Sequence, residues 1–175
     1  MKIRADHNRV RERLAGHGAT DRGRRTQRDT YYNAPARDFA ETDEALRVRH
    51  ETADGDRRAK LTYKGPLVGP TSKTREEHET GIEDGEVIEA ILESLGFVRV
   101  AVVEKDRDRF SLGECLVVLD SVAGLGEFVE VETEAHEEEI DAAREEVAGM
   151  IESLGLDPDA EIRTSYLELL LGDGD

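Results

Sequence analysis

Charged side chains recur at even spacing, most often two residues apart, inside segments that otherwise have the composition of β-strands. The pattern occurs in ALRVRH, AKLTYKG, VVEKDRDRF and EFVEVE, where it aligns Arg47 with Arg49, Lys60 with Lys64, Lys105 with Arg107 and Arg109, and Glu130 with Glu132. Successive side chains of a strand point to opposite faces, so each segment has one charged face. Several such faces around one space would form a cationic cavity with a carboxylate cluster. That combination suits a polyphosphate bound together with a metal ion.

The chain is strongly acidic, and the excess is concentrated in its second half. Its formal net charge is −17, and residues 110–175 hold two basic and 19 acidic side chains. This balance argues against a general nucleic-acid binder. Arginine outnumbers lysine 19 to five, and an acidic, lysine-poor surface resembles proteins adapted to high salt. Most individual acidic residues are therefore expected to be solvated surface groups.

The length of 175 residues fits a single domain, predicted to span residues 1–175. No apolar run approaches the roughly 18 residues of a membrane span, and no signal segment opens the chain. Cys115 is the only cysteine, which excludes an internal disulfide and suits a reducing compartment. We therefore expect a cytoplasmic protein with no membrane contact.

Helix signals occur at four places along the chain. Asp6 and Asp84 are N-cap candidates for helices that end near Gly16 and Gly96. A third helix is expected over about residues 137–153, before Pro158. The second helix has an apolar stripe, and a short closing helix has another; their members are Val87, Ile88, Ile91, Leu92 and Leu95, and Tyr166, Leu167, Leu170 and Leu171.

The remaining segments predict about eight strands in hairpin order. RGRRTQRDTYYN is expected as a strand pair or one long strand, and Asp54-Gly55 is a two-residue hairpin signal. The loop GPLVGPTSKT, residues 65–74 with Lys73, contains two prolines and two glycines and is a candidate lid. Few strand–helix–strand signals are present. The predicted fold class is therefore α+β, an antiparallel sheet with helices outside it.

The segment VVEKDRDRF offers no apolar face over its second half. Glu104, Asp106 and Asp108 share one face, and the basic residues share the other. An exposed edge strand, or a hairpin with charge on both sides, would explain this segment taken alone. Several strands each contribute cations to one face, however, and two cations about 6 Å apart repel by roughly 3 kcal/mol at an effective dielectric near 20. Clustered cations therefore need carboxylates or a bound anion beside them.

Three acidic residues in late strands are candidates for that neutralising role. Glu130 and Glu132 alternate with Val129 and Val131, and Asp120 lies in LVVLDSV. Hard oxygen ligands in such positions suit Mg²⁺ or Mn²⁺ bridging to phosphate oxygens. A half-exposed strand with a polar face is the alternative for EFVEVE alone.

The ordered set of these segments resembles the CYTH family, the triphosphate-tunnel enzymes that include class IV adenylate cyclases and thiamine triphosphatases. The matching segments are QRDTYYN at 27–33, ALRVR at 45–49, LTYKGP at 61–66, KTREEHET at 73–80, VEKDRDRF at 103–110, LDSVAGLGEFVEVE at 119–132 and SYLELL at 165–170. The class IV cyclase branch looks most similar. The resemblance implies an eight-stranded antiparallel closed β-barrel around a polar tunnel, with helices packed outside.

The resemblance also implies roles for individual residues. The cations expected to bind substrate phosphate are Lys2, Arg47, Arg49, Lys60, Lys64, Arg75, Lys105 and Arg107. Metal ligands would be Glu130, Glu132 and Asp120, and the catalytic set would be Glu130, Glu132 and Lys64. Glu77 and Glu79 would bind metal or orient the cations. The implied cofactor is Mg²⁺ or Mn²⁺.

The chain departs from the family at its first strand, whose pattern is Glu-x-Glu-x-Lys. Lys2 matches the lysine, but only Met1 precedes it. We expect that the chain starts several residues late, in which case in-frame Glu-x-Glu codons lie just upstream of Met1 in the gene. The alternative is impaired metal binding.

Three functional hypotheses follow for a small-molecule triphosphate partner. The leading one is adenylate cyclisation, in which ATP gives cyclic AMP and pyrophosphate. The second is hydrolysis of inorganic triphosphate, thiamine triphosphate or a nucleotide, and the third is a non-catalytic triphosphate-binding module. A purely structural barrel stays a further alternative for the function. Assembly into a homodimer is a separate alternative, which concerns the oligomeric state. Tyr31, Tyr32 and Tyr63 are the candidates for stacking on a base.

Overall fold

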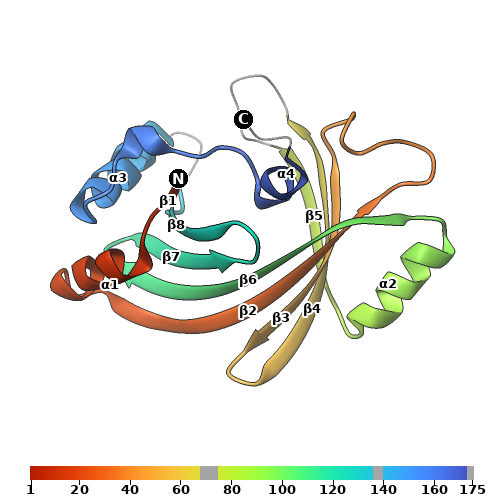
Figure 1. Ribbon diagram of the computed structural model, residues 1–175, viewed down its shortest axis with the longest axis horizontal. Helices are drawn as coiled ribbons and strands as arrows, with labels where there is room; N and C mark the ends of the chain where they lie inside the picture. The colour runs from red at the N-terminus through yellow and green to blue at the C-terminus, as the bar shows by residue number, and fades with distance from the viewer. Residues whose placement is uncertain (68–74, 136–139, 173–175) are drawn as a thin grey trace. The chain divides into compact units, whose positions relative to one another are not determined.

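The computed structural model describes residues 1–67, 75–135 and 140–172 (Figure 1). Within these residues the strands are β1 (Lys2–Arg4), β2 (Thr20–Asn33), β3 (Ala45–Ala53), β4 (Asp56–Leu67), β5 (Arg75–Ile82), β6 (Val98–Leu112), β7 (Cys115–Val122) and β8 (Gly126–Glu132). The helices are α1 (His7–Gly16), α2 (Gly85–Ser94), α3 (Ile140–Ser153), the short 3₁₀ helix η2 (Pro158–Ala160) and α4 (Tyr166–Leu171). Residues 68–74, which include Lys73 and most of the proposed lid, lie outside the described residues.

The eight strands form one sheet in the order β1-β8-β7-β6-β2-β3-β4-β5. The pairs β1–β8, β7–β8, β6–β7, β3–β4 and β4–β5 are antiparallel. The predicted eight-stranded antiparallel sheet is therefore confirmed. Over the described residues the order ends at β1 and β5, so the sheet is not closed into the barrel expected from the resemblance. β6 lies between two strands, and the alternative of an exposed edge strand is wrong for it.

The turn between β3 and β4 forms where the dipeptide signal predicted it. Asp54 and Gly55 both have positive φ, at 52° and 87°. A two-residue hairpin needs this left-handed conformation at both central positions because its twist must match that of the strands. The register that follows pairs Arg47 with Thr62 and Arg49 with Lys60, so the turn fixes the neighbours of both arginines.

The chain divides into two compact units, to which β2 and β6 both contribute. Unit 1 comprises residues 1–25 and 105–175, and unit 2 comprises residues 26–104. The hydrophobic core of unit 1 joins α1 and α3 to one face of β7 and β8; its members include Ile3, Val10, Leu14, Val117, Leu119, Val129, Val131, Val147 and Ile151. Because side chains alternate along a strand, Asp120 and Glu130 lie on the opposite face from this core.

The core of unit 2 packs α2 against the strands that carry the arginines. Leu46 and Val48 of β3 are buried with Tyr32, Phe39 and Leu92. Leu46 and Val48 alternate with Arg47 and Arg49, which therefore occupy the other face of β3.

The apolar stripe predicted for α2 is only partly buried. Leu92 is buried and Ile88 is partly buried against the same core, but Val87, Ile91 and Leu95 are exposed. A helix that packs on a sheet buries only the residues that face the sheet. The apolar stripe of α2 is wider than that face, so part of the stripe is exposed.

The first two helices begin where the capping residues predicted. The Asp6 side chain accepts hydrogen bonds from the backbone N–H groups of Asn8 and Arg9, and the Asp84 side chain accepts one from Val87. None of the helices in the described part of the chain has the length and hydropathy needed to cross a membrane.

Candidate functional site

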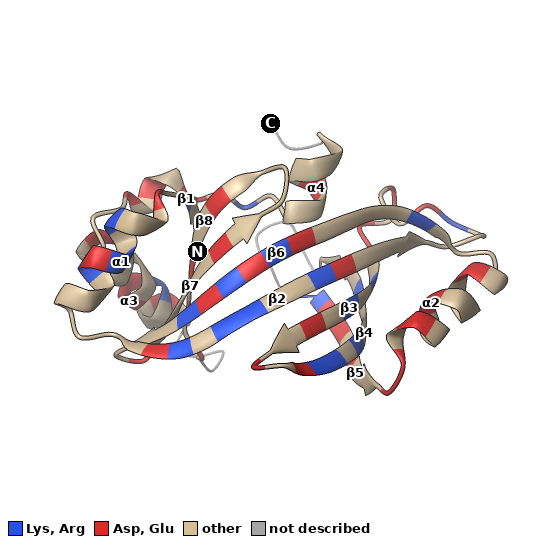
Figure 2. Cartoon of the chain, turned by 60° about the horizontal axis from the view of Figure 1, so that its bottom comes forward, with Lys and Arg blue, Asp and Glu red and all other residues tan. Residues whose placement is uncertain are grey.

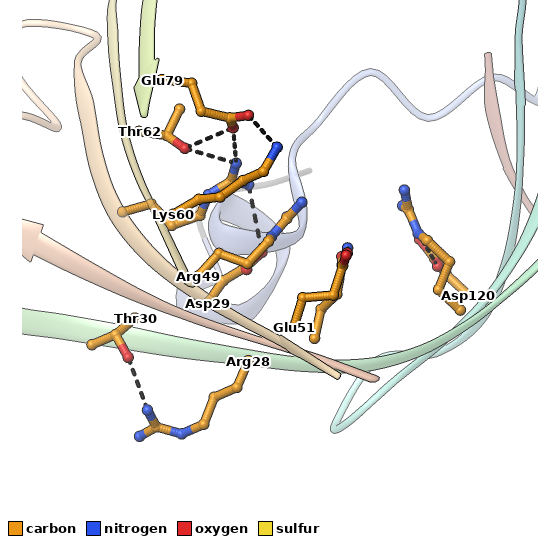
Figure 3. Close-up of polar contacts among 12 residues, drawn as sticks. Arg28, Asp29, Thr30, Arg49, Glu51, Lys60, Thr62, Glu79 and Asp120 are labelled. Carbon is orange, nitrogen blue, oxygen red and sulfur yellow. Dashed lines mark hydrogen bonds and ion pairs between the residues drawn. The ribbon is translucent and has the colours of Figure 1, made fainter. Parts of the chain in front are cut away.

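Unit 2 contains a group of charged side chains that we call the arginine cluster, made of Asp29, Arg47, Arg49, Thr62 and Glu79. Its geometry follows from the strand register, which places Arg47 of β3 opposite Thr62 of β4 and Thr62 opposite Glu79 of β5. Three neighbouring strands therefore present one polar row on the face opposite the core. Figure 3 shows Asp29, Arg49, Thr62 and Glu79 gathered together with Lys60.

Asp29 of β2 holds both arginines of this cluster. Its two carboxylate oxygens accept hydrogen bonds from Nε and Nη2 of Arg49, each at 2.6 Å, and Nη1 of Arg47 lies 3.5 Å from Oδ2. The Asp29 side chain is only 1% exposed. A bidentate carboxylate fixes the plane of a guanidinium, so Asp29 orients Arg49 and contacts a second cation beside it.

Glu79 forms the second acidic point of the arginine cluster. It accepts hydrogen bonds from Lys60 Nζ at 2.5 Å and from the Thr62 hydroxyl at 3.0 Å, and Arg47 Nη2 lies 3.9 Å away. The hydrogen bond from Lys60 is the main reason why the pKa of Glu79 is lowered from its ordinary value. Glu79 is thus held as a carboxylate that orients cations, one of the two roles predicted for it.

Two further cations that were predicted to bind phosphate, Lys64 and Arg75, form partly exposed ion pairs with residues that are not members of the arginine cluster. Lys64 Nζ lies 2.9 Å from Glu77, its register partner across β4 and β5. Arg75 Nη2 lies 3.4 Å from Asp43. Both cations are in the same unit as the arginine cluster.

Unit 1 contains a second group, the carboxylate cluster, made of Arg107, Asp120, Glu130 and Tyr166. The Arg107 guanidinium donates to both oxygens of Asp120, at 2.8 and 2.6 Å, and to Glu130 at 2.8 Å. The Asp120 side chain is 0% exposed. Burial lowers the pKa of Arg107, but the hydrogen bonds and charges of the two carboxylates outweigh it, and the net pKa is raised.

Two predicted lysines lie beside the carboxylate cluster, over the ring of Tyr166. The Lys2 and Lys105 ammonium nitrogens are 4.3 and 5.2 Å from the ring centroid. Lys2 also donates to the carbonyl oxygen of Thr164 and lies opposite Glu130 in the β1–β8 register. Unit 1 therefore brings together Lys2, Lys105, Arg107, Asp120 and Glu130, all of which the resemblance implied as site residues.

The acidic residues predicted as metal ligands are engaged differently from one another. Asp120 and Glu130 both bind Arg107, whereas Glu132 is exposed at the end of β8. Among the described residues no group of three or more Asp, Glu, His or Cys side chains is arranged as a metal site. The donors are nevertheless hard carboxylate oxygens, which fit Mg²⁺ or Mn²⁺ by chemistry. The metal site stays a prediction.

The other face of β6 is a solvated surface. Asp106 lies 2.7 Å from Arg24, and Asp108 contacts Arg11 of α1. Figure 2 shows the alternation of basic and acidic residues along β6 as blue and red bands, beside a run of basic residues on β2. The two faces predicted for VVEKDRDRF are thus an outer ion-pair face and an inner face that carries Lys105 and Arg107.

Sequence reasoning did not assign Asp29 or Tyr166 to a site. Asp29 alternates with Gln27 and Tyr31 on one face of its strand, and that polar alternation was the available signal. Tyr166 occupies an apolar helix position, and its sequence context gives no sign of its hydroxyl, which donates to Asp120 at 3.1 Å.

Of the three tyrosines predicted as stacking candidates, two have other partners. Tyr32 is buried in the core of unit 2. Tyr63 stacks on His78 with centroids 6.2 Å apart, and its hydroxyl donates to Glu44. The pKa of Tyr31 is raised by burial, with Arg47 acting in the opposite direction. Tyr31 therefore lies within the influence of the arginine cluster.

Comparison with known proteins identifies relatives over nearly the whole chain. The family model of the CYTH domain matches residues 1–166. A protein of Methanocaldococcus jannaschii named "Putative adenylate cyclase" is 41% identical over 165 residues, which are 94% of this chain and 92% of that protein.

Solved structures agree with this assignment of the fold. A protein from Pyrococcus horikoshii is 37% identical and superposes with a TM-score of 0.85, covering 98% of this chain and 97% of that chain. A Hippeastrum protein described as a "Putative adenylyl cyclase" with a dominant triphosphatase activity is 16% identical, with a TM-score of 0.72 over 99% of this chain and 94% of that chain. At that identity the second likeness concerns the fold alone.

Proposed function

This chain belongs to the CYTH family, and on that premise we propose that it is a metal-dependent enzyme acting on a triphosphate, with ATP cyclisation as its reaction. The observation that carries the proposal is the 41% identity to the M. jannaschii protein named "Putative adenylate cyclase". Three of the eight expected cations, Arg47, Arg49 and Arg107, belong to the two clusters, and Lys2, Lys60 and Lys105 contact members of them, which supports the same proposal.

The arginine cluster is proposed to bind phosphate oxygens. Asp29 engages one edge of the Arg49 guanidinium and the end of the Arg47 guanidinium. Planar guanidinium groups match the geometry of phosphate oxygens, and groups that are already oriented lose little freedom on binding. Lys60 and Lys64 would add charge at the partly exposed side of the same unit.

The carboxylate cluster is proposed to supply both a cation and the metal ligands. Arg107, with Lys2 and Lys105, would bind phosphate, and Glu130 with Asp120 and Glu132 would hold Mg²⁺ or Mn²⁺. Such an ion, when bound, neutralises charge on phosphate oxygens and orients them. Asp120 and Glu130 share Arg107, so a bound anion that draws Arg107 towards itself would free carboxylate oxygens for the ion.

The proposed reaction needs stabilisation of charge more than covalent help from the protein. In cyclisation the ribose 3′-oxygen bonds to the α-phosphorus, the bond from that phosphorus to the bridging oxygen breaks, and pyrophosphate leaves with the negative charge. Cations placed where that charge develops lower the barrier because they are ordered before the reaction. Lys64, Arg47 and Arg49 are the residues proposed for that role in unit 2.

Triphosphate hydrolysis is the second candidate. The Hippeastrum protein, which shares the fold, is described as having a dominant triphosphatase activity. In hydrolysis a water oxygen bonds to the terminal phosphorus and gives up a proton to solvent, the bond from that phosphorus to the bridging oxygen breaks, and orthophosphate and the remaining diphosphate group are released. The same cations would serve both reactions, and a fold can carry more than one chemistry.

Phosphorus NMR separates these candidates in a single set of reactions. The protein is incubated with ATP, inorganic triphosphate and thiamine triphosphate in the presence of Mg²⁺ or Mn²⁺. Cyclic AMP with pyrophosphate is the result expected for the leading proposal. Orthophosphate release would favour the hydrolase, and binding without turnover would identify a triphosphate-binding module. Failure to bind or convert any of the three would overturn the proposed function.

A further inference from the structure

Tyr166 is the first residue of α4 and is fixed in place from several sides. A capping box between Ser165 and Glu168 sets the start of the helix. The ring packs edge-on against Phe128 with centroids 5.1 Å apart, and the residue is 8% exposed. Its position is therefore defined by packing as well as by hydrogen bonds.

The ring and the hydroxyl of Tyr166 reach different charged groups of unit 1. The ammonium nitrogens of Lys2 and Lys105 lie 4.3 and 5.2 Å from the ring centroid. The hydroxyl donates to Oδ2 of Asp120, the same oxygen that accepts from Nη2 of Arg107 at 2.6 Å. Tyr166 thus contacts two lysines through its ring, and it reaches Arg107 through the carboxylate of Asp120.

An aromatic face holds a cation without neutralising it. The attraction of an ammonium to a ring is weaker than a hydrogen-bonded ion pair with a carboxylate. The ring of Tyr166 therefore helps to order the ammonium groups of Lys2 and Lys105 while they keep their charge. The hydroxyl adds a third hydrogen bond to Asp120, which keeps the plane of the Arg107 guanidinium constant.

We propose that Tyr166 is a positioning residue of the phosphate-binding site: its ring orders the ammonium groups of Lys2 and Lys105, and its hydroxyl orders Asp120 and through it Arg107. This inference rests on the proposed function, because it assumes that these three cations bind a triphosphate. It adds a residue of the C-terminal segment to a site otherwise built from strands.

The variants Tyr166→Phe and Tyr166→Leu separate the two contributions. The phenylalanine variant keeps the ring, so we expect inorganic triphosphate with Mg²⁺ to bind about threefold more weakly than to the natural protein. The leucine variant also loses the ring, and we expect binding at least about tenfold weaker. Tyr32→Phe is the matched control, since Tyr32 is a buried tyrosine of unit 2 that belongs to neither cluster.

A spectroscopic measurement distinguishes positioning from a packing role. When triphosphate draws the ammonium groups from the ring, the near-ultraviolet absorption of Tyr166 should shift. We expect a tyrosine difference spectrum on adding triphosphate to the natural protein and to Tyr32→Phe, and its loss in Tyr166→Phe. Thermal midpoints of all variants, measured without ligand, show whether each variant is folded.

The outcomes are distinct for the inference and for the function on which it rests. If the natural protein binds no triphosphate, the proposed function fails. If the natural protein binds but folded Tyr166→Leu binds equally well, the inference is wrong and the function stands. A difference spectrum that persists unchanged in Tyr166→Phe would also overturn the inference.

Discussion

The arginine cluster of unit 2 and the carboxylate cluster of unit 1 are built around the same element, a buried aspartate that holds an arginine through two hydrogen bonds. Asp29 binds Arg49 in this way, and Asp120 binds Arg107. The two clusters differ in what else the aspartate and arginine contact. Asp29 is shared with a second arginine, whereas Asp120 is shared with a tyrosine hydroxyl and its arginine with a second carboxylate.

The difference shows what each cluster can offer a ligand. In the arginine cluster one carboxylate contacts two guanidinium groups, so two cationic groups are held beside the same aspartate. In the carboxylate cluster one guanidinium is shared by two carboxylates, so oxygen atoms are available once the arginine moves. The first arrangement favours phosphate, and the second favours phosphate together with a metal ion.

The largest effect is expected when the aspartates are replaced. Asp29→Asn should lower the free energy of unfolding by about 3–5 kcal/mol, because it removes the bidentate carboxylate of Arg49 and the nearer of the two carboxylates beside Arg47, and both arginines are largely buried. Asp120→Asn should lower the free energy of unfolding by less, because Glu130 still pairs with Arg107. Urea denaturation of both variants tests the order. Equal losses, or a larger loss for Asp120→Asn, would contradict the contrast drawn between the clusters.

Sequence alone predicted most of the framework that carries these aspartates. The even spacing of charges, the Asp54-Gly55 turn and the helix caps at Asp6 and Asp84 are local signals, and each is confirmed. Local patterns specify which face a side chain occupies because strand geometry has a period of two.

The partners within each cluster could not be predicted in the same way. Asp29 meets Arg49 across the β2–β3 neighbour pair, and Tyr166 meets Asp120 across 46 residues of sequence. These contacts depend on strand order and helix docking, which spacing does not encode. The partial burial of the α2 stripe could not be predicted for a related reason: an apolar pattern does not tell how much of a helix its sheet will cover.

The second largest effect concerns ligand binding by the arginine cluster. An Arg47→Ala/Arg49→Ala variant should bind inorganic triphosphate about 100-fold more weakly, since two charge-assisted contacts are lost. Isothermal titration calorimetry measures this directly. Arg24→Ala is the control, because Arg24 pairs with Asp106 on the solvated face of β6. A double variant that retains full affinity would remove the arginine cluster from the site.

The metal-binding role of the other cluster gives an intermediate effect. Glu130→Gln should weaken Mn²⁺ binding about tenfold in the presence of triphosphate, because a charged oxygen ligand becomes neutral. Electron paramagnetic resonance of free Mn²⁺ measures the affinity. Glu127→Gln, on the same strand but in contact with His7, should leave it unchanged. Equal affinities in all three proteins would place the metal elsewhere.

The smallest effect comes from an ion pair outside both clusters, where Arg37 holds Glu44. The two hydrogen bonds from Arg37, with those from Thr42 and Tyr63, lower the pKa of Glu44 from 4.5 to about 2. The pKa is depressed in the folded state, so the stabilisation is complete above about pH 4.5 and is lost as the pH falls towards 2.

The thermal midpoint of Glu44→Gln checks this prediction. It should lie slightly below that of the natural protein at pH 7, and the gap should close between pH 4.5 and 2. A gap that stays constant through this interval would show that Glu44 contributes through packing rather than charge.

The most direct test of the central claim follows the phosphorus resonances of ATP with Mg²⁺ in the natural protein and in Arg47→Ala/Arg49→Ala. The account predicts that the natural protein converts ATP to cyclic AMP and pyrophosphate and that the double variant, though folded, does so at least about 100-fold more slowly. Equal rates in the two proteins would contradict the account, as would a natural protein that leaves ATP unchanged.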